Sequence, residues 1–225
     1  TLIHKQVQIN DCLVQLELDD LTERERNVIL HRIEQLINQA WHTNEIRQQR
    51  PTPVDEAKWG FAVIENSLWP AMPDFMRQLD ERLQETFGVR LPLDAAPVRF
   101  ASWMGGDRDG NPFVTAKVTR EVLLTSRWVA LNLFHQDVQE LVSELSMIDC
   151  DDDIRARAGT SNEPYRVVLR RLRDDIKETL QNLTARLQGQ YTENRDIICR
   201  TEQLRRPLEL CYHSLHTCGM GIIAD

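Results

Sequence analysis

The stretch PVRFASWMGGDRDGNP, from Pro97 to Pro112, joins an extended segment to a glycine-rich charged loop. Side chains of the extended part alternate between two faces, with Val98, Phe100 and Ser102 on one and Arg99, Ala101 and Trp103 on the other. This period of two predicts one β-strand at residues 97–104. A single strand forms no sheet, so we expect it to pair with strands beyond these residues.

The surrounding sequence predicts helices almost everywhere else. Apolar residues at helical spacing predict helices at residues 2–18, 22–41, 55–88, 115–147, 164–187 and 201–217, with a polar loop at residues 149–163. Thr22 followed by Glu25 predicts a capping box, Asp55 is a candidate N-cap, and Gly88 is a candidate helix stop. A strand, a charged loop and a long helix in that order form a βα unit, in which the loop carries the site.

Composition narrows the classes of protein further. The chain has 225 residues, is 41% hydrophobic and carries a net charge of −8, which argues against nonspecific binding to nucleic acid or anionic membranes. No apolar run has the length of a membrane span, and no signal peptide is visible. The five cysteines are scattered without a C-x-x-C pair, which is typical of reduced thiols in the cytoplasm.

Both ends of the sequence suggest a piece of a longer chain. TLIHKQVQIND, at residues 1–11, begins inside a helical pattern without a methionine, and GMGIIAD, at residues 219–225, stops as an apolar run starts. We therefore expect further protein on both sides.

The loop at residues 105–112 does not fit the familiar ion or nucleotide motifs. Pro112 and Val118 stand where an EF-hand needs glycine and glutamate, and GGDRDG lacks the G-x-G-x-x-G spacing. Two interpretations stay open. The loop is a tight turn held by Asp–Arg pairs, or Asp107 and Asp109 hold Arg108 beside Trp103 to orient an anion in a dry pocket.

Two other motifs have simpler interpretations. CYHSLHTC, at residues 211–218, resembles a zinc site, but Cys211 and His213 lie about 200° apart on a helix at roughly 100° per residue. We expect core cysteines and surface histidines. Arg47 and Arg50 form either a solvated helix end or a contact for an anionic effector.

Four stretches carry a resemblance to a known family. They are FASWMGGDRDGNPFVTAKVTREVLLTSRW, LVSELS, RPTPVDEAKWGFAVIENSLW and CGMGIIA. Together they resemble bacterial phosphoenolpyruvate carboxylase, and the likeness extends over the whole chain. It implies a predominantly α-helical piece of a TIM-type β/α barrel enzyme, with residues 1–225 forming part of a single domain and residues 97–104 one barrel strand.

The resemblance also implies a reaction and its partners. Family enzymes are cytoplasmic homotetramers that join phosphoenolpyruvate and bicarbonate into oxaloacetate and phosphate with Mg²⁺ or Mn²⁺. The metal ligands, the catalytic lysine and the histidine of a TAHPTE-type motif are expected outside these residues. Trp103, Asp107, Arg108 and Asp109 then have supporting roles: the indole walls a dry pocket, Arg108 lies near the anions, and the aspartates orient it. The alternative is a noncatalytic helical module that binds an effector or a partner protein.

Overall fold

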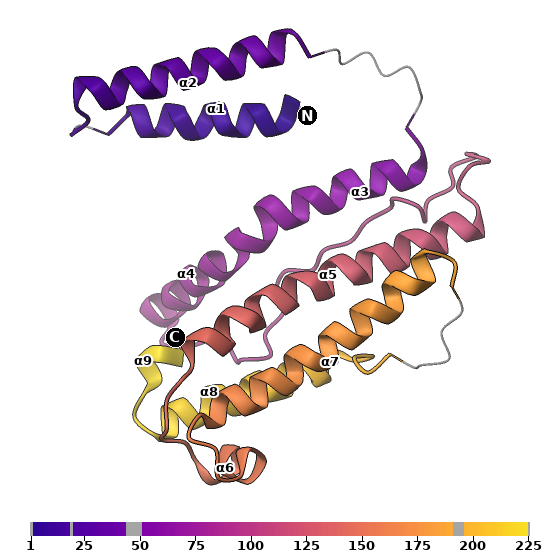
Figure 1. The fold of residues 1–225 in the computed structure, drawn as a ribbon. Helices are drawn as coiled ribbons and strands as arrows, with labels where there is room; N and C mark the ends of the chain where they lie inside the picture. The colour runs from indigo at the N-terminus through magenta and orange to yellow at the C-terminus, as the bar shows by residue number, and fades with distance from the viewer. Residues whose placement is uncertain (1, 19, 44–50, 191–195, 225) are drawn as a thin grey trace. The chain divides into compact units, whose positions relative to one another are not determined.

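The computed structural model describes residues 2–18, 20–43, 51–190 and 196–224, and these residues are mostly helical (Figure 1). The chain divides into two compact units, Thr1–Arg50 and Pro51–Asp225. The prediction of one partial domain for residues 1–225 concerns the longer protein and stays a prediction.

The first unit is a hairpin of two antiparallel helices, α1 (Leu2–Leu16) and α2 (Glu23–Trp41). Lys5 Nζ near the start of α1 donates to the Gln39 carbonyl (3.0 Å) and to Thr43 Oγ1 (2.7 Å) at the end of α2. The capping box predicted from Thr22 and Glu25 is confirmed, because each residue bonds the backbone of the other.

The second unit begins with a long helical run interrupted by one wide turn. It consists of α3 (Pro53–Val63), the π-helical turn η1 (Ile64–Leu68) and α4 (Trp69–Phe87). The predicted N-cap Asp55 is wrong: Thr52 caps α3, and Asp55 is its capping-box partner at the third helical position. Gly88 ends α4 as predicted, with a left-handed φ of 70° that costs glycine little.

The predicted strand at residues 97–104 is not present. Residues 97–103 belong to no helix, turn or strand, and residues 96–103 are exposed along both faces. No strand occurs anywhere in the described ranges. The alternating pattern is therefore present without a ladder, because a strand needs a hydrogen-bonded neighbour and none of the described segments supplies one.

Five further helices follow in the described part of the second unit. They are α5 (Ala116–Glu144), α6 (Asp152–Ala158), α7 (Pro164–Leu187) and α8 (Thr201–Thr217), followed by the short α9 (Gly221–Ala224). The predicted loop at residues 149–163 is partly wrong, because Asp151 caps the short helix α6 within it. The long predicted helix ends at Glu144, three residues before the expected Met147.

Helices α5 and α7 lie side by side and hold most of the core (Figure 1). The apolar stripe predicted for α7 is confirmed at Leu169, Leu172, Ile176 and Leu183, which are all buried. Helix α8 adds Cys211 and Leu215 to the same cluster. Among the described helices, none is both long and apolar enough to span a bilayer. The chain is thus a helical assembly, and a surrounding barrel stays a prediction.

Candidate functional site

The glycine-rich loop is a chain of tight turns between the extended segment and α5. The backbone amides of Gly106 and Asp107 both donate to the Trp103 carbonyl, at 3.0 and 2.8 Å. Further along, Asp109 has a positive φ of 31° and Gly110 one of 72°. A positive φ is uncommon for a residue with a side chain, although aspartate tolerates it better than most. The loop therefore has a defined backbone conformation.

The base of this loop packs onto the second unit, while its tip is exposed. Met104 contacts an apolar cluster whose buried members are Ala57 and Phe61 of α3 and Val122 of α5. Gly105 is buried next to it. At the far end, Asn111 Oδ1 accepts a hydrogen bond from the Phe113 amide (3.0 Å), and Thr115 caps α5. The loop is thus attached at both ends.

All four predicted site residues lie on the exposed part of the loop. The Trp103 side chain is 77% exposed, and Asp107, Arg108 and Asp109 are exposed as well. Within the part of the chain that the structure describes, no ion pair joins Arg108 to either aspartate. The chain therefore places these residues together on one loop but does not by itself form the Asp–Arg contacts or a dry pocket. Their supporting catalytic roles stay predictions.

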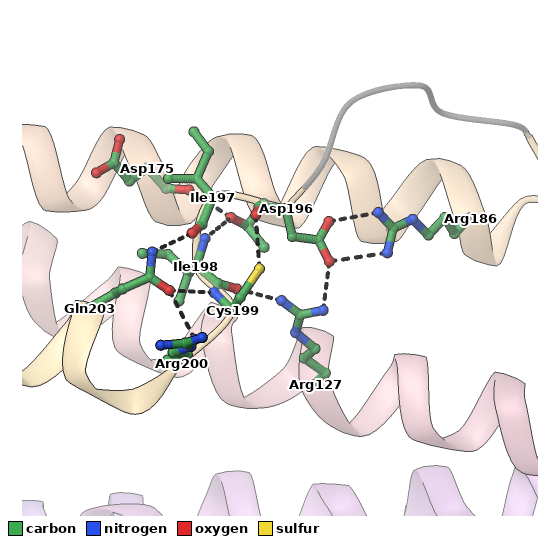
Figure 2. A network of polar contacts seen from close by, with 10 residues as sticks. Arg127, Asp175, Arg186, Asp196, Ile197, Ile198, Cys199, Arg200 and Gln203 are labelled. Atoms are coloured by element: carbon green, nitrogen blue, oxygen red, sulfur yellow. Dashed lines mark hydrogen bonds and ion pairs between the residues drawn. The ribbon is translucent and has the colours of Figure 1, made fainter.

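A charged network that sequence reasoning missed lies where the chain enters α8. The Asp196 carboxylate, 5% exposed, lies between Arg127 of α5 and Arg186 of α7 (Figure 2). Arg127 donates to Asp196 Oδ2 (2.6 Å) and to the Ile198 carbonyl. A buried carboxylate shared by two guanidinium groups joins three segments of the chain.

Side-chain caps continue this network into the first turn of α8. Gln203 Oε1 accepts from the amides of Cys199 (2.8 Å) and Arg200 (2.9 Å), while Gln203 Nε2 donates to the Ile197 carbonyl (2.6 Å) (Figure 2). Thr179 Oγ1 of α7 accepts from the Ile198 amide (3.1 Å). These bonds satisfy backbone groups at the helix entry, so we interpret the network as structural. No local spacing signals it, since Asp196 and Arg127 are 69 positions apart.

The cysteine and histidine motif of α8 divides between two faces as predicted. Cys211 is buried in the core, and burial raises the pKa of its thiol to about 12. His213 is exposed on the other side of the helix. In the described ranges, no three His, Cys, Asp or Glu side chains converge as metal ligands would. Arg47 and Arg50, the candidate effector contacts, lie outside the described residues.

A groove of about 760 Å³ lies between α6, α7 and α8, away from the loop. Its lining includes Arg157, Arg171, Arg206, Asp175 and Glu202 together with apolar side chains. Burial raises the pKa of the Asp175 carboxyl, and Arg171 partly offsets that effect. The groove contains none of the four predicted site residues.

The described residues form a helical protein in which a charged, glycine-rich loop follows an extended segment and leads into the long core helix α5. The family model for phosphoenolpyruvate carboxylase matches residues 1–225. The chain belongs to the phosphoenolpyruvate carboxylase family.

Curated relatives agree over the whole chain. It is 74% identical to a phosphoenolpyruvate carboxylase of Tolumonas auensis and 71% identical to one of Aeromonas salmonicida, over 225 residues in each case. A phosphoenolpyruvate carboxylase of Psychromonas ingrahamii is 59% identical over 226 residues. All of this chain is covered, but only 26% of each relative's length. The chain thus spans about a quarter of the curated relatives it matches.

Proposed function

We propose that this chain is a segment of an enzyme that carboxylates phosphoenolpyruvate with bicarbonate, giving oxaloacetate and phosphate. The observation that carries the proposal is the 74% identity to a phosphoenolpyruvate carboxylase along all 225 residues, the charged loop included. The complete enzyme is proposed to be a cytoplasmic, allosterically regulated homotetramer that replenishes the tricarboxylic acid cycle. A noncatalytic effector-binding or partner-binding module is the less favoured alternative.

The proposed chemistry has two steps. An oxygen of bicarbonate forms a bond to phosphorus as the bond from phosphorus to the enol oxygen breaks, which gives carboxyphosphate and the enolate of pyruvate. Carboxyphosphate then releases CO₂ and phosphate, and C3 of the enolate attacks CO₂ to form oxaloacetate. Developing negative charge needs fixed positive groups, and the enolate needs protection from water.

The charged loop is proposed to serve both needs in the complete enzyme. Trp103 forms an apolar wall that retains CO₂ beside the enolate. Arg108 contributes positive charge near the anionic reactants, and Asp107 and Asp109 orient it. The exposure of Trp103 in this chain is compatible with such a role, because an uncovered indole is available to line a pocket completed by other parts of the enzyme.

The metal is proposed to lie elsewhere in the enzyme. Among the described residues, no three His, Cys, Asp or Glu side chains lie close enough together to hold a cation. We propose that Mg²⁺ or Mn²⁺, and the catalytic histidine and lysine, are held by residues outside this chain.

The test is expression of the complete gene that encodes this chain, followed by an assay of oxaloacetate formation. We expect formation to require both phosphoenolpyruvate and bicarbonate, with one phosphate released per oxaloacetate. A purified, folded full-length protein that forms no oxaloacetate under these conditions would favour the noncatalytic module instead.

A further inference from the structure

Trp103 owes its position to the backbone that follows it, because its own side chain is largely uncovered. The Trp103 carbonyl accepts hydrogen bonds from the amides of Gly106 and Asp107. The two residues between, Met104 and Gly105, are the part of the loop that packs onto the helices. The contacts that hold Met104 and Gly105 in place therefore also set the position of the Trp103 backbone, and with it the position of the indole.

Met104 packs against α3 at Gly60, where a residue with a side chain would displace it. A Cβ added at Gly60 would lie 2.1 Å from Met104 Cε and 2.7 Å from Sδ, which is shorter than any normal contact between non-bonded atoms. The thioether thus lies directly over the backbone of α3. Because the clashing atoms end a flexible side chain, Met104 can move aside at modest cost.

Gly105 is held more rigidly, by two contacts with α5. A Cβ there would lie 2.6 Å from Val122 Cγ2 and 2.8 Å from Val122 Cβ, and its φ of 71° already disfavours a side chain. Thr119 Oγ1 donates a 2.6 Å hydrogen bond to the Gly105 carbonyl. Rotation of a valine side chain about χ1 is restricted, so Val122 cannot easily move to make room at Gly105.

We propose that Thr119 and Gly105 are positioning residues that set the place of Trp103 and thereby determine how completely CO₂ is retained during carboxylation. The inference rests on the proposed function. Thr119 acts through the Gly105 carbonyl and touches no reactant itself. An indole anchored only through its backbone moves when that anchor loosens, and sub-ångström to ångström shifts near a reacting centre change rates strongly.

The expected defect has a chemical signature. When CO₂ escapes before C3 of the enolate attacks it, C3 takes a proton instead and the products are pyruvate, CO₂ and phosphate. Phosphoenolpyruvate is then consumed and phosphate released without oxaloacetate. A loosened anchor should therefore raise the ratio of pyruvate to oxaloacetate, whereas a general loss of stability would lower both products together.

The experiment uses the full-length enzyme with the variants Thr119→Val, Thr119→Ser and Thr125→Val. Valine keeps the shape of Thr119 without its hydroxyl, and serine keeps the hydroxyl. Thr119 Oγ1 also lies 3.2 Å from the Thr115 carbonyl four residues earlier, and Thr125 Oγ1 makes the same kind of contact with the Glu121 carbonyl (2.9 Å). Thr125→Val is therefore a matched control for the loss of that local bond. Pyruvate, oxaloacetate and phosphate are measured at saturating phosphoenolpyruvate and bicarbonate.

We expect Thr119→Val to raise the ratio of pyruvate to oxaloacetate roughly tenfold, a shift that a displacement well below 1 Å can cause. The KM for phosphoenolpyruvate should stay within about twofold of wild type, because no binding group is removed. Thr119→Ser and Thr125→Val should both retain the wild-type ratio.

Other outcomes decide against the inference in distinguishable ways. If wild-type enzyme forms oxaloacetate and folded Thr119→Val has the wild-type ratio, the positioning role is wrong while the proposed function stands. If wild type forms none, both fail together. Should Thr119→Val not fold, Thr119→Ala removes the same hydroxyl with less bulk, and an unchanged ratio in folded Thr119→Ala overturns the inference.

Discussion

Arg186 contacts both carboxylate oxygens of Asp196, at 3.0 Å to Oδ2 and 2.9 Å to Oδ1. This paired geometry fixes the orientation of the carboxylate, and Arg127 then binds Oδ2 from a second helix. Charge-assisted bonds of this kind are shorter and stronger than neutral ones, and here they connect α5, α7 and the entry to α8 (Figure 2).

Replacing Asp196 with alanine should destabilise this corner of the fold. Two guanidinium groups would lose their shared partner, at a cost of about 2–3 kcal/mol, below the value for fully buried pairs because both arginines keep some contact with water. Hydrogen exchange of α7 and α8 amides in the full-length protein measures the change. Asp174→Ala is the control: its contact with Arg173 is 61% exposed on the carboxylate side, so protection should change by under about 0.5 kcal/mol.

Ser214→Ala should cost more than Tyr165→Phe, although the two residues share one hydrogen bond. Both are fully buried, with their oxygens 2.9 Å apart, and Ser214 Oγ also accepts from the Asp151 amide at 2.9 Å. Removing the serine leaves two buried groups unpaired, about 2 kcal/mol or more, whereas removing the phenol oxygen leaves the serine its other partner, about 1 kcal/mol. The Asp151 amide should lose exchange protection in Ser214→Ala alone. Equal effects of the two variants would contradict this assignment.

The sequence predicted those features that depend on neighbouring residues. Thr22 and Glu25 are three positions apart, so their capping box is readable locally, and Gly88 stops α4 by its own backbone preference. Asp55 was misplaced because Thr52 and Asp55 satisfy the same capping pattern, and the threonine is the member that precedes the helix. Helix α6 was missed because seven residues are too few to show a period.

Features that depend on distant partners were beyond local reasoning. The alternation at residues 97–104 is real, but a strand exists only with a paired neighbour, and in the described ranges it has none. Asp196 carries no signal of burial until Arg127 and Arg186 meet it in space. The residues of the charged loop were identifiable from their composition, whereas their exposure on this chain was not.

Lowering the pH should reduce the stability of α5 more in the wild-type protein than in the His135→Gln variant. Burial lowers the pKa of the His135 imidazole from 6.5, Arg173 and Lys177 lower it further, and Asp174 acts in the opposite direction. The pKa of His135 is therefore lower in the folded than in the unfolded protein, and the unfolded protein binds more protons between the two values. The fold is most stable above the unfolded-state pKa of His135, and it loses free energy of unfolding as the pH falls through the folded-state pKa. Exchange protection of α5 amides, compared between pH 7 and pH 5 after correction for intrinsic rates, measures this. Identical losses in both proteins would contradict it.

Trp103→Ala should leave the fold intact and impair carboxylation. The indole is 77% exposed in this chain, so its removal should change local stability by under about 0.5 kcal/mol. In the full-length enzyme we expect oxaloacetate formation to fall about tenfold or more, equivalent to about 1.4 kcal/mol, with little change in phosphoenolpyruvate binding. Equal losses in binding and in carboxylation would count against the apolar-wall role.

Asp109 allows a backbone role and a carboxylate role to be separated, because its φ of 31° is positive. Asparagine tolerates this conformation and keeps the shape of aspartate without its charge, whereas valine is strained there by about 1 kcal/mol or more. If the carboxylate orients Arg108 in the complete enzyme, Asp109→Asn should lower kcat/KM for phosphoenolpyruvate about tenfold without loss of stability. Wild-type kinetics in Asp109→Asn, together with a defect in Asp109→Val, would assign the residue to the turn alone and leave Arg108 to be oriented by other groups.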